Sequence, residues 1–367
     1  MAQEPPQIAI IGAGIFVKSQ YLPRLAEISD LVVLKAIWSR SEKSSMEAAD
    51  IARKVFPNVE CKWGDHGLDE IIRDSNIVGV VVALAGQIQV DMSLKLLKAG
   101  KHVLQGNPLK NIKKPAAASI SEVETALSCY NSLYTNPSAQ KIWAVAENYR
   151  FEPAFVESKK LMSEIGDMMS VQVIIEGSMN SSNPYFTSSW RRNFTGGFIL
   201  DMGVHYIAGL RMLVGCEVAS VSAMTSHVDM TLPPPDTISS LFQLENGCSG
   251  VFVMLVSSKS PKIVWRVVGL NGTVQVERGN NNGRHGYVTT LFGGNGETKS
   301  NFYPFSGVTE ELKSFLSDIS IDTLEKGGKI KGEGRYSYVE GARDVAVLDA
   351  MIESGMKQGA FVKVKRF

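Results

Sequence analysis

The sequence has few cysteines, and their spacing matches neither a metal site nor a disulfide framework. Four cysteines occur in 367 residues. No two of them form a C-x-x-C pair, and no histidine lies at metal-ligand spacing from them. We therefore expect no metal site and four buried free thiols, at Cys61, Cys129, Cys216 and Cys248.

A large excess of either charge is also missing. The chain carries 38 basic and 37 acidic residues, which gives a formal net charge of +1. A protein held to nucleic acid or to an anionic membrane by bulk charge would be far more basic. The composition favours a small-molecule substrate as the partner, with no nucleic acid and no membrane.

Long hydrophobic runs are absent as well. The longest nearly apolar run, residues 77–85, is too short to cross a bilayer. The opening residues, MAQEPPQ, show no charged segment followed by an apolar one, as an ordinary secretory signal would. We expect a cytoplasmic protein.

The first part of the chain alternates between apolar strands and amphipathic helices. Hydrophobic periodicity predicts strands at residues 8–11, 31–38, 58–62, 77–84 and 102–104, and helices at residues 16–28, 42–55, 67–74 and 87–99. Continuous apolar strands between helices are typical of a parallel sheet covered on both faces. The fold class is therefore α/β, and the length of the chain predicts a second domain.

A glycine turn follows the first predicted strand. Gly12 and Gly14 form a G-x-G pair, although the third position of the fingerprint is Val17, where glycine or alanine is usual. The pair alone would also fit a simple tight turn, but together with the alternation it indicates a Rossmann dinucleotide-binding fold. We expect the cofactor to contact the ends of the strands, at Gly12, Gly14, Ile15, Phe16, Leu84 and Asn107.

The end of the second strand suggests which dinucleotide is bound. Ser39 and Arg40 stand where the adenosine ribose is normally recognised. A guanidinium pairs with phosphate oxygens in a bidentate way, so this segment favours the 2'-phosphate of NADP. NAD stays open because Glu42 could accept from a ribose hydroxyl, and a solvated basic turn is the other alternative.

Together with the glycine turn, the segment Gly100-Lys101-His102-Val103-Leu104 resembles the glucose-fructose oxidoreductase and inositol dehydrogenase (Gfo/Idh/MocA) family. The resemblance extends over nearly the whole chain. It implies an NAD(P)-dependent oxidoreductase acting on CH-OH groups. It also implies a homo-oligomer, because the C-terminal sheet commonly packs against its copy in a dimer.

The catalytic E-K-P motif of that family is altered in this chain. Counted from the preceding strand, the motif falls on residues 106–108, with Asn107 in the place of the lysine. Counted back from the following helix it falls on residues 113–115, so that an insertion of seven residues separates the two registers. We choose Lys114 as the catalytic lysine, with Lys110, Lys113 or a merely solvated charge run as alternatives.

In the second half the hydrophobic period changes to alternation. Strands are predicted at residues 170–177, 218–227, 238–244, 249–257, 262–268 and 273–277, with hairpin signals at Asn246-Gly247 and Asn271-Gly272 and polar loops at residues 280–286 and 293–296. This pattern predicts an open, mostly antiparallel sheet in an α+β domain. The expected domains are 1–148, which binds NAD(P), and 149–367, which binds substrate and oligomerises; the C-terminal helix could pack back on the first.

The helix opened by Gly196-Gly197 carries an acid/base pair. Asp201 and His205 stand at i and i+4, so both point from one face of the helix. A carboxylate can orient an imidazole and raise its basicity, which suits proton transfer at a carbinol hydroxyl. A structural pair is the alternative. The family pattern G-G-x-x-x-D-x-G-x-H matches here and implies catalytic roles for both residues, although its frequent further aspartate is replaced by Ala208.

Three further residues are candidates for substrate contact. They are Arg150, Trp190 and Arg192. An interdomain salt bridge is the alternative for Arg150, and a surface turn is the alternative for the other two. The resulting hypothesis is an NADP-dependent oxidoreductase acting on a sugar, a polyol or another small carbonyl compound. The alternatives are a catalytically impaired regulator of the same fold and a non-redox enzyme with tightly held NAD.

Replacing Arg40 tests the predicted cofactor preference. We expect Arg40→Ala to weaken NADPH binding much more than NADH binding, because only NADPH carries the phosphate that the guanidinium would contact. Fluorescence titration with each cofactor measures both losses. Equal losses would contradict the assignment of the 2'-phosphate site.

Overall fold

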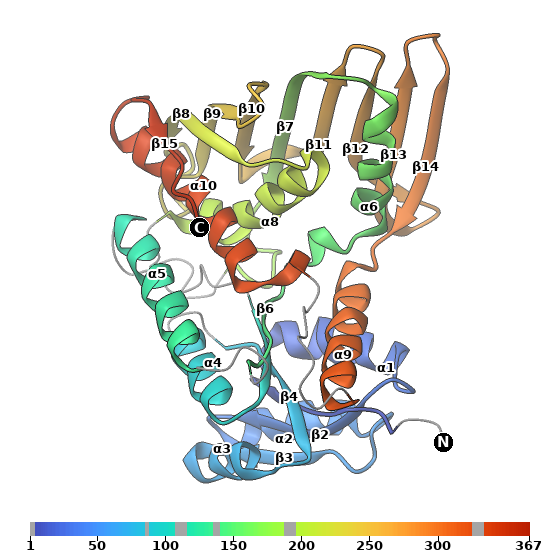
Figure 1. Cartoon of the computed structure of the whole chain (residues 1–367), viewed down its shortest axis with the longest axis vertical. Coiled ribbons are helices and arrows are strands. Elements are labelled where there is room, and N and C mark those ends of the chain that lie inside the picture. Colours follow the sequence, from blue (N-terminus) through green and yellow to red (C-terminus); the bar gives the residue numbers. More distant parts are fainter. Residues whose placement is uncertain (1–3, 85–87, 107–115, 135–139, 187–195, 325–333) are drawn as a thin grey trace. The chain divides into compact units, whose positions relative to one another are not determined.

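A computed structural model describes residues 4–84, 88–106, 116–134, 140–186, 196–324 and 334–367 (Figure 1). Contacts divide the chain into two compact units. The first comprises Met1–Asn111, Glu122–Asn148 and Val308–Gly341, and the second comprises Ile112–Ser121, Tyr149–Gly307 and Ala342–Phe367. One boundary between the units lies between residues 148 and 149, which is also where the boundary between the expected domains lies. Val308–Gly341 belongs to the first unit, although it lies within the expected second domain.

The first unit is built on a six-stranded parallel sheet. Its strand order is β3-β2-β1-β4-β5-β6. The central strands are almost completely buried, which explains their uninterrupted apolar sequences. The strands are β1 (Gln7–Ile11), β2 (Val33–Ser39), β3 (Glu60–Trp63), β4 (Ile77–Val82), β5 (His102–Gln105) and β6 (Trp143–Val145). The reversal of strand order at β1 and β4 is the position where doubly wound sheets bind ligands.

Helices alternate with these strands, as the periodicity predicted. They are a π-helical turn (Val17–Tyr21) continued by α1 (Leu22–Glu27), then α2 (Glu42–Ala52), α3 (Gly64–Arg73), α4 (Gln89–Lys98) and α5 (Ala116–Ser132). A later helix, α9 (Gly307–Leu324), also packs on this sheet. A Cβ atom at Gly79 of β4 would lie 2.9 Å from Ile319 of α9, so glycine allows the close approach.

The second unit contains a nine-stranded, mostly antiparallel sheet (Figure 1). Its strand order is β14-β13-β12-β11-β7-β10-β9-β8-β15, and β10 runs parallel to β7. The strands are β7 (Met168–Ser178), β8 (Val218–Ser226), β9 (Thr237–Leu244), β10 (Ser249–Leu255), β11 (Ser257–Gly269), β12 (Gly272–Asn281), β13 (Arg284–Gly293), β14 (Thr298–Pro304) and β15 (Val362–Lys363). The predicted hairpins at Asn246-Gly247 and Asn271-Gly272 join β9 to β10 and β11 to β12.

The polar loop predicted at residues 280–286 is wrong. Only Asn282 and Gly283 form the turn, and both have positive φ angles, of 51° and 80°. Residues on either side continue β12 and β13 as a hairpin. Sequence periodicity missed these strand ends because they are exposed on both faces and therefore carry polar residues without alternation.

The helices of the second unit centre on α8 (Gly197–Val214), which is buried along most of its length. It packs with α6 (Pro153–Leu161), with the sheet and with the part of α10 (Tyr338–Met356) that belongs to this unit. Among the described residues α8 is the one helix long and apolar enough to cross a membrane, but 78% of it is buried inside the protein. A helix that is apolar all round is expected at such a core position.

The expectation of buried cysteines holds for only one of the four. Cys248 is buried, Cys61 and Cys216 are half-buried, and Cys129 is exposed. All four are free thiols. Cys129 lies near the end of the amphipathic helix α5. Exposing its small side chain to solvent on the outer face of this helix costs little free energy.

A buried ion network connects three elements of the second unit. Arg211 of α8 donates to Asp344 of α10 over 2.7 Å and makes two further bonds of 2.7 Å to Glu217. Arg150 also donates to Asp344. The Asp344 side chain is only 2% exposed, so it accepts from two guanidinium groups away from water.

Removing the shared carboxylate should therefore be costly. We expect Asp344→Ala to lower the free energy of unfolding by about 3–5 kcal/mol, because two buried guanidinium groups lose their common partner. Urea denaturation followed by circular dichroism measures the change. The control is Glu353→Gln, also on α10, which removes a more exposed pair with Lys357 just beyond the helix and should cost below about 1 kcal/mol. If the two variants lowered the free energy of unfolding equally, the buried network would contribute no more stability than an exposed ion pair.

Candidate functional site

The end of β1 can lie against the end of β4 only because residue 12 is glycine. Gly12 has a φ of +126°, and a Cβ atom there would lie 2.4 Å from the carbonyl oxygen of Ala83. Its N–H donates to the carbonyl of Trp38 over 2.8 Å, which ties the turn to β2 as well. Gly14, by contrast, faces open space, with no atom within 4 Å of a Cβ position. The turn thus leaves room for a ligand against its backbone.

The helical segment after this turn begins at the carboxyl edge of the sheet. Ile15 is 50% exposed and Phe16 is 37% exposed, and the Phe16 ring packs edge-on against Tyr21 at 5.0 Å between centroids. A helix start beside an open glycine turn suits a pyrophosphate, because the N–H groups of the first helical turn and the helix dipole favour negative charge. The predicted residues of this segment therefore fit a dinucleotide.

Ser39 and Arg40 lie at the same edge of the sheet, after β2. Ser39 is half-buried and Arg40 is exposed. The next residue, Ser41, caps α2 by accepting from the N–H of Ser44. Arg40 makes no ion pair with any residue that the structure describes, so its guanidinium is available to a phosphate. Leu84, beyond β4, accepts from the Gln89 side chain through its carbonyl over 2.7 Å.

The segment that follows β5 is only partly described. Gln105 ends β5 fully buried, and its Oε1 accepts from the indole of Trp143 over 3.1 Å. Asn107 and Lys114, with the alternatives Lys110 and Lys113, lie outside the described residues. Their predicted roles stay predictions.

Two residues of the G-K-H-V-L segment have structural roles. The Lys101 ammonium is buried and donates to the carbonyl oxygens of Asp74 and Ile77, the latter over 2.8 Å. His102 accepts from the N–H of Ile142 through Nδ1 over 3.1 Å. The segment thus joins β5 to the neighbouring connections of the sheet.

The glycine pair at the start of α8 is required by its surroundings. Gly196 and Gly197 have φ angles of +89° and +50°. A Cβ atom on Gly197 would lie 2.9 Å from Pro233, and one on Gly196 would lie 2.3 Å from Leu200. The loop that carries Pro233 is braced by buried Asp236, which accepts from two backbone N–H groups over 2.9 and 2.6 Å. Packing therefore fixes where α8 begins.

Asp201 and His205 lie one turn apart on α8, as predicted. Asp201 is 9% exposed and His205 is half-buried. The ring of Tyr149 stacks on His205, with 5.6 Å between ring centroids and 16° between ring planes. No local sequence pattern indicates Tyr149, because this contact joins residues 56 positions apart in different elements. Trp190 and Arg192 lie outside the described residues.

Arg150 differs from its predicted role. Its side chain is 4% exposed and pairs with Asp344. The salt-bridge alternative is the one that the structure favours, although the bridge lies within the second unit. A buried guanidinium held by a carboxylate is a poor candidate for substrate contact.

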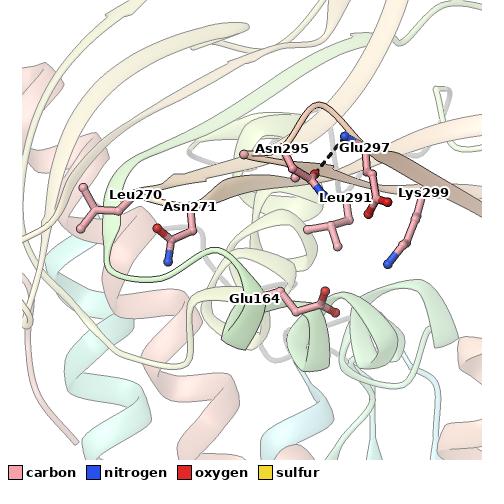
Figure 2. Close-up of a pocket in the computed structure, with 9 residues that line it drawn as sticks. Glu164, Leu270, Asn271, Leu291, Asn295, Glu297 and Lys299 are labelled. Atoms are coloured by element: carbon pink, nitrogen blue, oxygen red, sulfur yellow. Dashed lines mark hydrogen bonds between the residues drawn. The ribbon is translucent and has the colours of Figure 1, made fainter.

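A cavity of about 550 Å³ opens elsewhere in the second unit (Figure 2). Its polar lining comes from Glu164, near the end of α6, from the strand turns that carry Asn271, Asn295 and Glu297, and from Lys299 of β14. The Asn295 side chain accepts from the N–H of Glu297 over 3.0 Å, which stabilises one of these turns. Neither Asp201 nor His205, nor any other predicted site residue that the structure describes, lines this cavity.

Each half of the chain matches a model of a known protein family. Residues 7–131 match the family model described as "Oxidoreductase family, NAD-binding Rossmann fold", and residues 157–275 match the "GFO/IDH/MocA C-terminal domain". The chain belongs to the Gfo/Idh/MocA family of oxidoreductases. The first match contains the glycine turn, and the second contains Asp201 and His205.

Relatives of this Gfo/Idh/MocA chain match it over lengths that range from 58% to 98% of the chain. A protein of Fusarium mangiferae named a dehydrogenase is 29% identical over 98% of this chain and 99% of its own. An NADP⁺-dependent scyllo-inositol 2-dehydrogenase of Bacillus subtilis is 26% identical over 58% of this chain and 53% of its own. An inositol dehydrogenase homologue of Azotobacter vinelandii, solved with NADH and myo-inositol, shares the fold with a TM-score of 0.77, at 16% identity and 98% coverage of both chains.

The buried ammonium of Lys101 should affect stability at alkaline pH. Burial lowers the pKa of Lys101 from its ordinary value of 10.5. The unfolded chain then binds more protons than the folded protein between the two pKa values, so the free energy of unfolding rises with pH across that window. We expect Lys101→Met to lose this rise and, at neutral pH, about 2 kcal/mol from the lost hydrogen bonds.

Urea denaturation at several pH values from neutral to alkaline measures both effects. The control is Lys98→Met, which removes an exposed lysine of α4 and should keep the wild-type pH dependence. If the free energy of unfolding of Lys101→Met rose with pH as much as that of the wild type, the buried ammonium would not be the cause of the rise.

Proposed function

We propose that this protein is an NADP-dependent oxidoreductase that transfers hydride between the nicotinamide and a carbinol or carbonyl carbon. The observation that supports it most strongly is the placement of Asp201 and His205 one turn apart on α8, inside the segment matched by the family's C-terminal domain. Bound nicotinamide would supply the hydride chemistry. The protein would supply cofactor binding, orientation and proton transfer.

His205 is the residue that moves the proton of the substrate hydroxyl in this proposal. Its half-buried side chain is an imidazole, the group that most often acts as a general acid or base in enzymes. Asp201, on the same face and more deeply buried, stabilises the charged imidazole or binds the substrate hydroxyl. Lys114 is proposed as the second group that polarises the substrate oxygen.

NADP is the proposed cofactor because of Arg40. An exposed guanidinium at the end of β2, with no ion pair among the described residues, suits a 2'-phosphate. The Bacillus subtilis relative is named for NADP⁺, whereas the Azotobacter vinelandii neighbour was solved with NADH. The comparisons thus support a nicotinamide dinucleotide, and Arg40 supports the choice of NADP.

The proposed substrate is a sugar, a polyol or another small carbonyl compound. The names of two relatives refer to inositols, which are polyols whose carbinol carbons undergo this type of reaction. A homo-oligomer formed through the nine-stranded sheet, and a cytoplasmic location, are part of the same proposal.

Replacing His205 tests the proposed acid/base. We expect His205→Asn to lower kcat by about 10²- to 10⁴-fold, the usual contribution of a positioned acid/base, while NADPH binding stays unchanged. The measurement is NADPH oxidation with a panel of sugar and polyol carbonyl compounds, with fluorescence titration for the cofactor. The control is His285→Asn, an exposed histidine of β13.

Other outcomes would point to the alternatives. Tight NADPH binding without turnover on any compound, unchanged in Lys114→Ala and His205→Asn, would contradict the enzyme and favour a regulator of the same fold. Release of product from a glycoside without net change in the cofactor would favour the non-redox enzyme.

A further inference from the structure

We propose that Tyr149 is a positioning residue that holds the His205 imidazole in its working orientation through ring stacking. The two rings lie nearly parallel, with 16° between their planes and 5.6 Å between their centroids. Both residues belong to the second unit. The inference rests on the proposed acid/base role of His205 and adds the residue that would keep its ring in place.

The backbone on the C-terminal side of Tyr149 is firmly anchored. Arg150 donates to buried Asp344 of α10. The carboxylate of Glu152, itself 3% exposed, accepts from the N–H of Ser306 over 3.1 Å. α6 then begins at Pro153. The segment that carries Tyr149 is therefore held by two different parts of the second unit.

The Tyr149 ring is also enclosed by other aromatic side chains. The rings of Phe155, Tyr206, Trp265 and Tyr287 lie with their centroids 5.8–6.1 Å from it, at interplanar angles of 49–89°. These four rings are all buried. The planes of these four rings are inclined to the plane of the Tyr149 ring, whereas the plane of the His205 ring is nearly parallel to it. Offset and edge contacts of this kind favour one orientation of the central ring.

Hydrogen bonds fix the far end of the same ring. The Tyr149 hydroxyl shares hydrogen bonds with the hydroxyl groups of Tyr206 and Tyr287. Burial raises the pKa of both partner hydroxyls, Tyr206 and Tyr287, well above the ordinary value, so both partners stay neutral. The ring is thus fixed by its backbone, by packing and by its hydroxyl, and it presents one face to the half-buried imidazole.

A fixed ring face limits the orientations of the imidazole beside it. Rotation of His205 about its terminal torsion would break the parallel contact, and that torsion is broad for an unrestrained histidine. Proton transfer requires a ring nitrogen within hydrogen-bond distance of the substrate oxygen. A displacement of about 1 Å is enough to cost on the order of 100-fold in rate.

The experiment compares Tyr149→Leu with Tyr149→Phe in the full-length protein. The sequence contains only five histidines, so the ring resonances of ¹³C-labelled histidine are few, and His205→Asn assigns the one of interest. We expect Tyr149→Leu to move the His205 resonance toward that of a free histidine. Tyr149→Phe keeps the ring and should restore the wild-type resonance. In turnover, Tyr149→Leu should lower kcat by about 100-fold with little change in KM.

Phe305→Leu is the matched control, because it removes a ring that packs on Tyr287 at the edge of the same aromatic cluster. It should leave the His205 resonance near its wild-type position. A shift as large as that of Tyr149→Leu would mean that general loosening of the cluster moves His205, which would overturn the proposal. An unshifted resonance in Tyr149→Leu would overturn it as well.

The two proposals fail in different ways. If the wild type turns over no carbonyl compound, the proposed function fails while the NMR comparison still tests the stacking. If His205→Asn abolishes turnover but Tyr149→Leu changes neither kcat nor the resonance, the proposed function stands and the positioning role is refuted.

Discussion

The burial of α8 on nearly every side is the constraint on which the second unit depends. A helix can approach its neighbours this closely only where it carries small residues. A Cβ atom at Gly203 would lie 3.0 Å from Leu348 of α10, and one at Gly209 would lie 2.8 Å from Phe155 of α6. Close packing fixes the rotation of α8 about its axis, and this rotation decides which way Asp201 and His205 point.

Electrostatics strengthens the same arrangement. Asp344 accepts from Arg211 of α8 and from Arg150, the residue after Tyr149, so one buried carboxylate connects α8, α10 and the segment that carries Tyr149. Such a network stabilises a single packing, because any other packing would leave buried charges without partners. The residues that hold the site in place are thus different from those proposed to perform its chemistry.

Much of the first unit could be predicted from the sequence. Strands such as Ile77–Val82 are apolar throughout, which is the pattern of a strand covered on both faces, and Gly12 marks the turn after β1. The second unit was harder. The strands β13 and β14 were not predicted, since their ends are exposed and polar, and Arg150 was given a substrate role because its partner Asp344 lies 194 residues away.

The sequence by itself determined the fold class, the dinucleotide-binding edge and the i, i+4 spacing of Asp201 and His205, because each of these depends on local periodicity or on a short motif. Only the tertiary structure decided that Lys101 and Arg150 are structural and that Tyr149 stacks on His205. These outcomes depend on contacts between distant segments. No local pattern encodes which side chains meet once the strands and helices have packed.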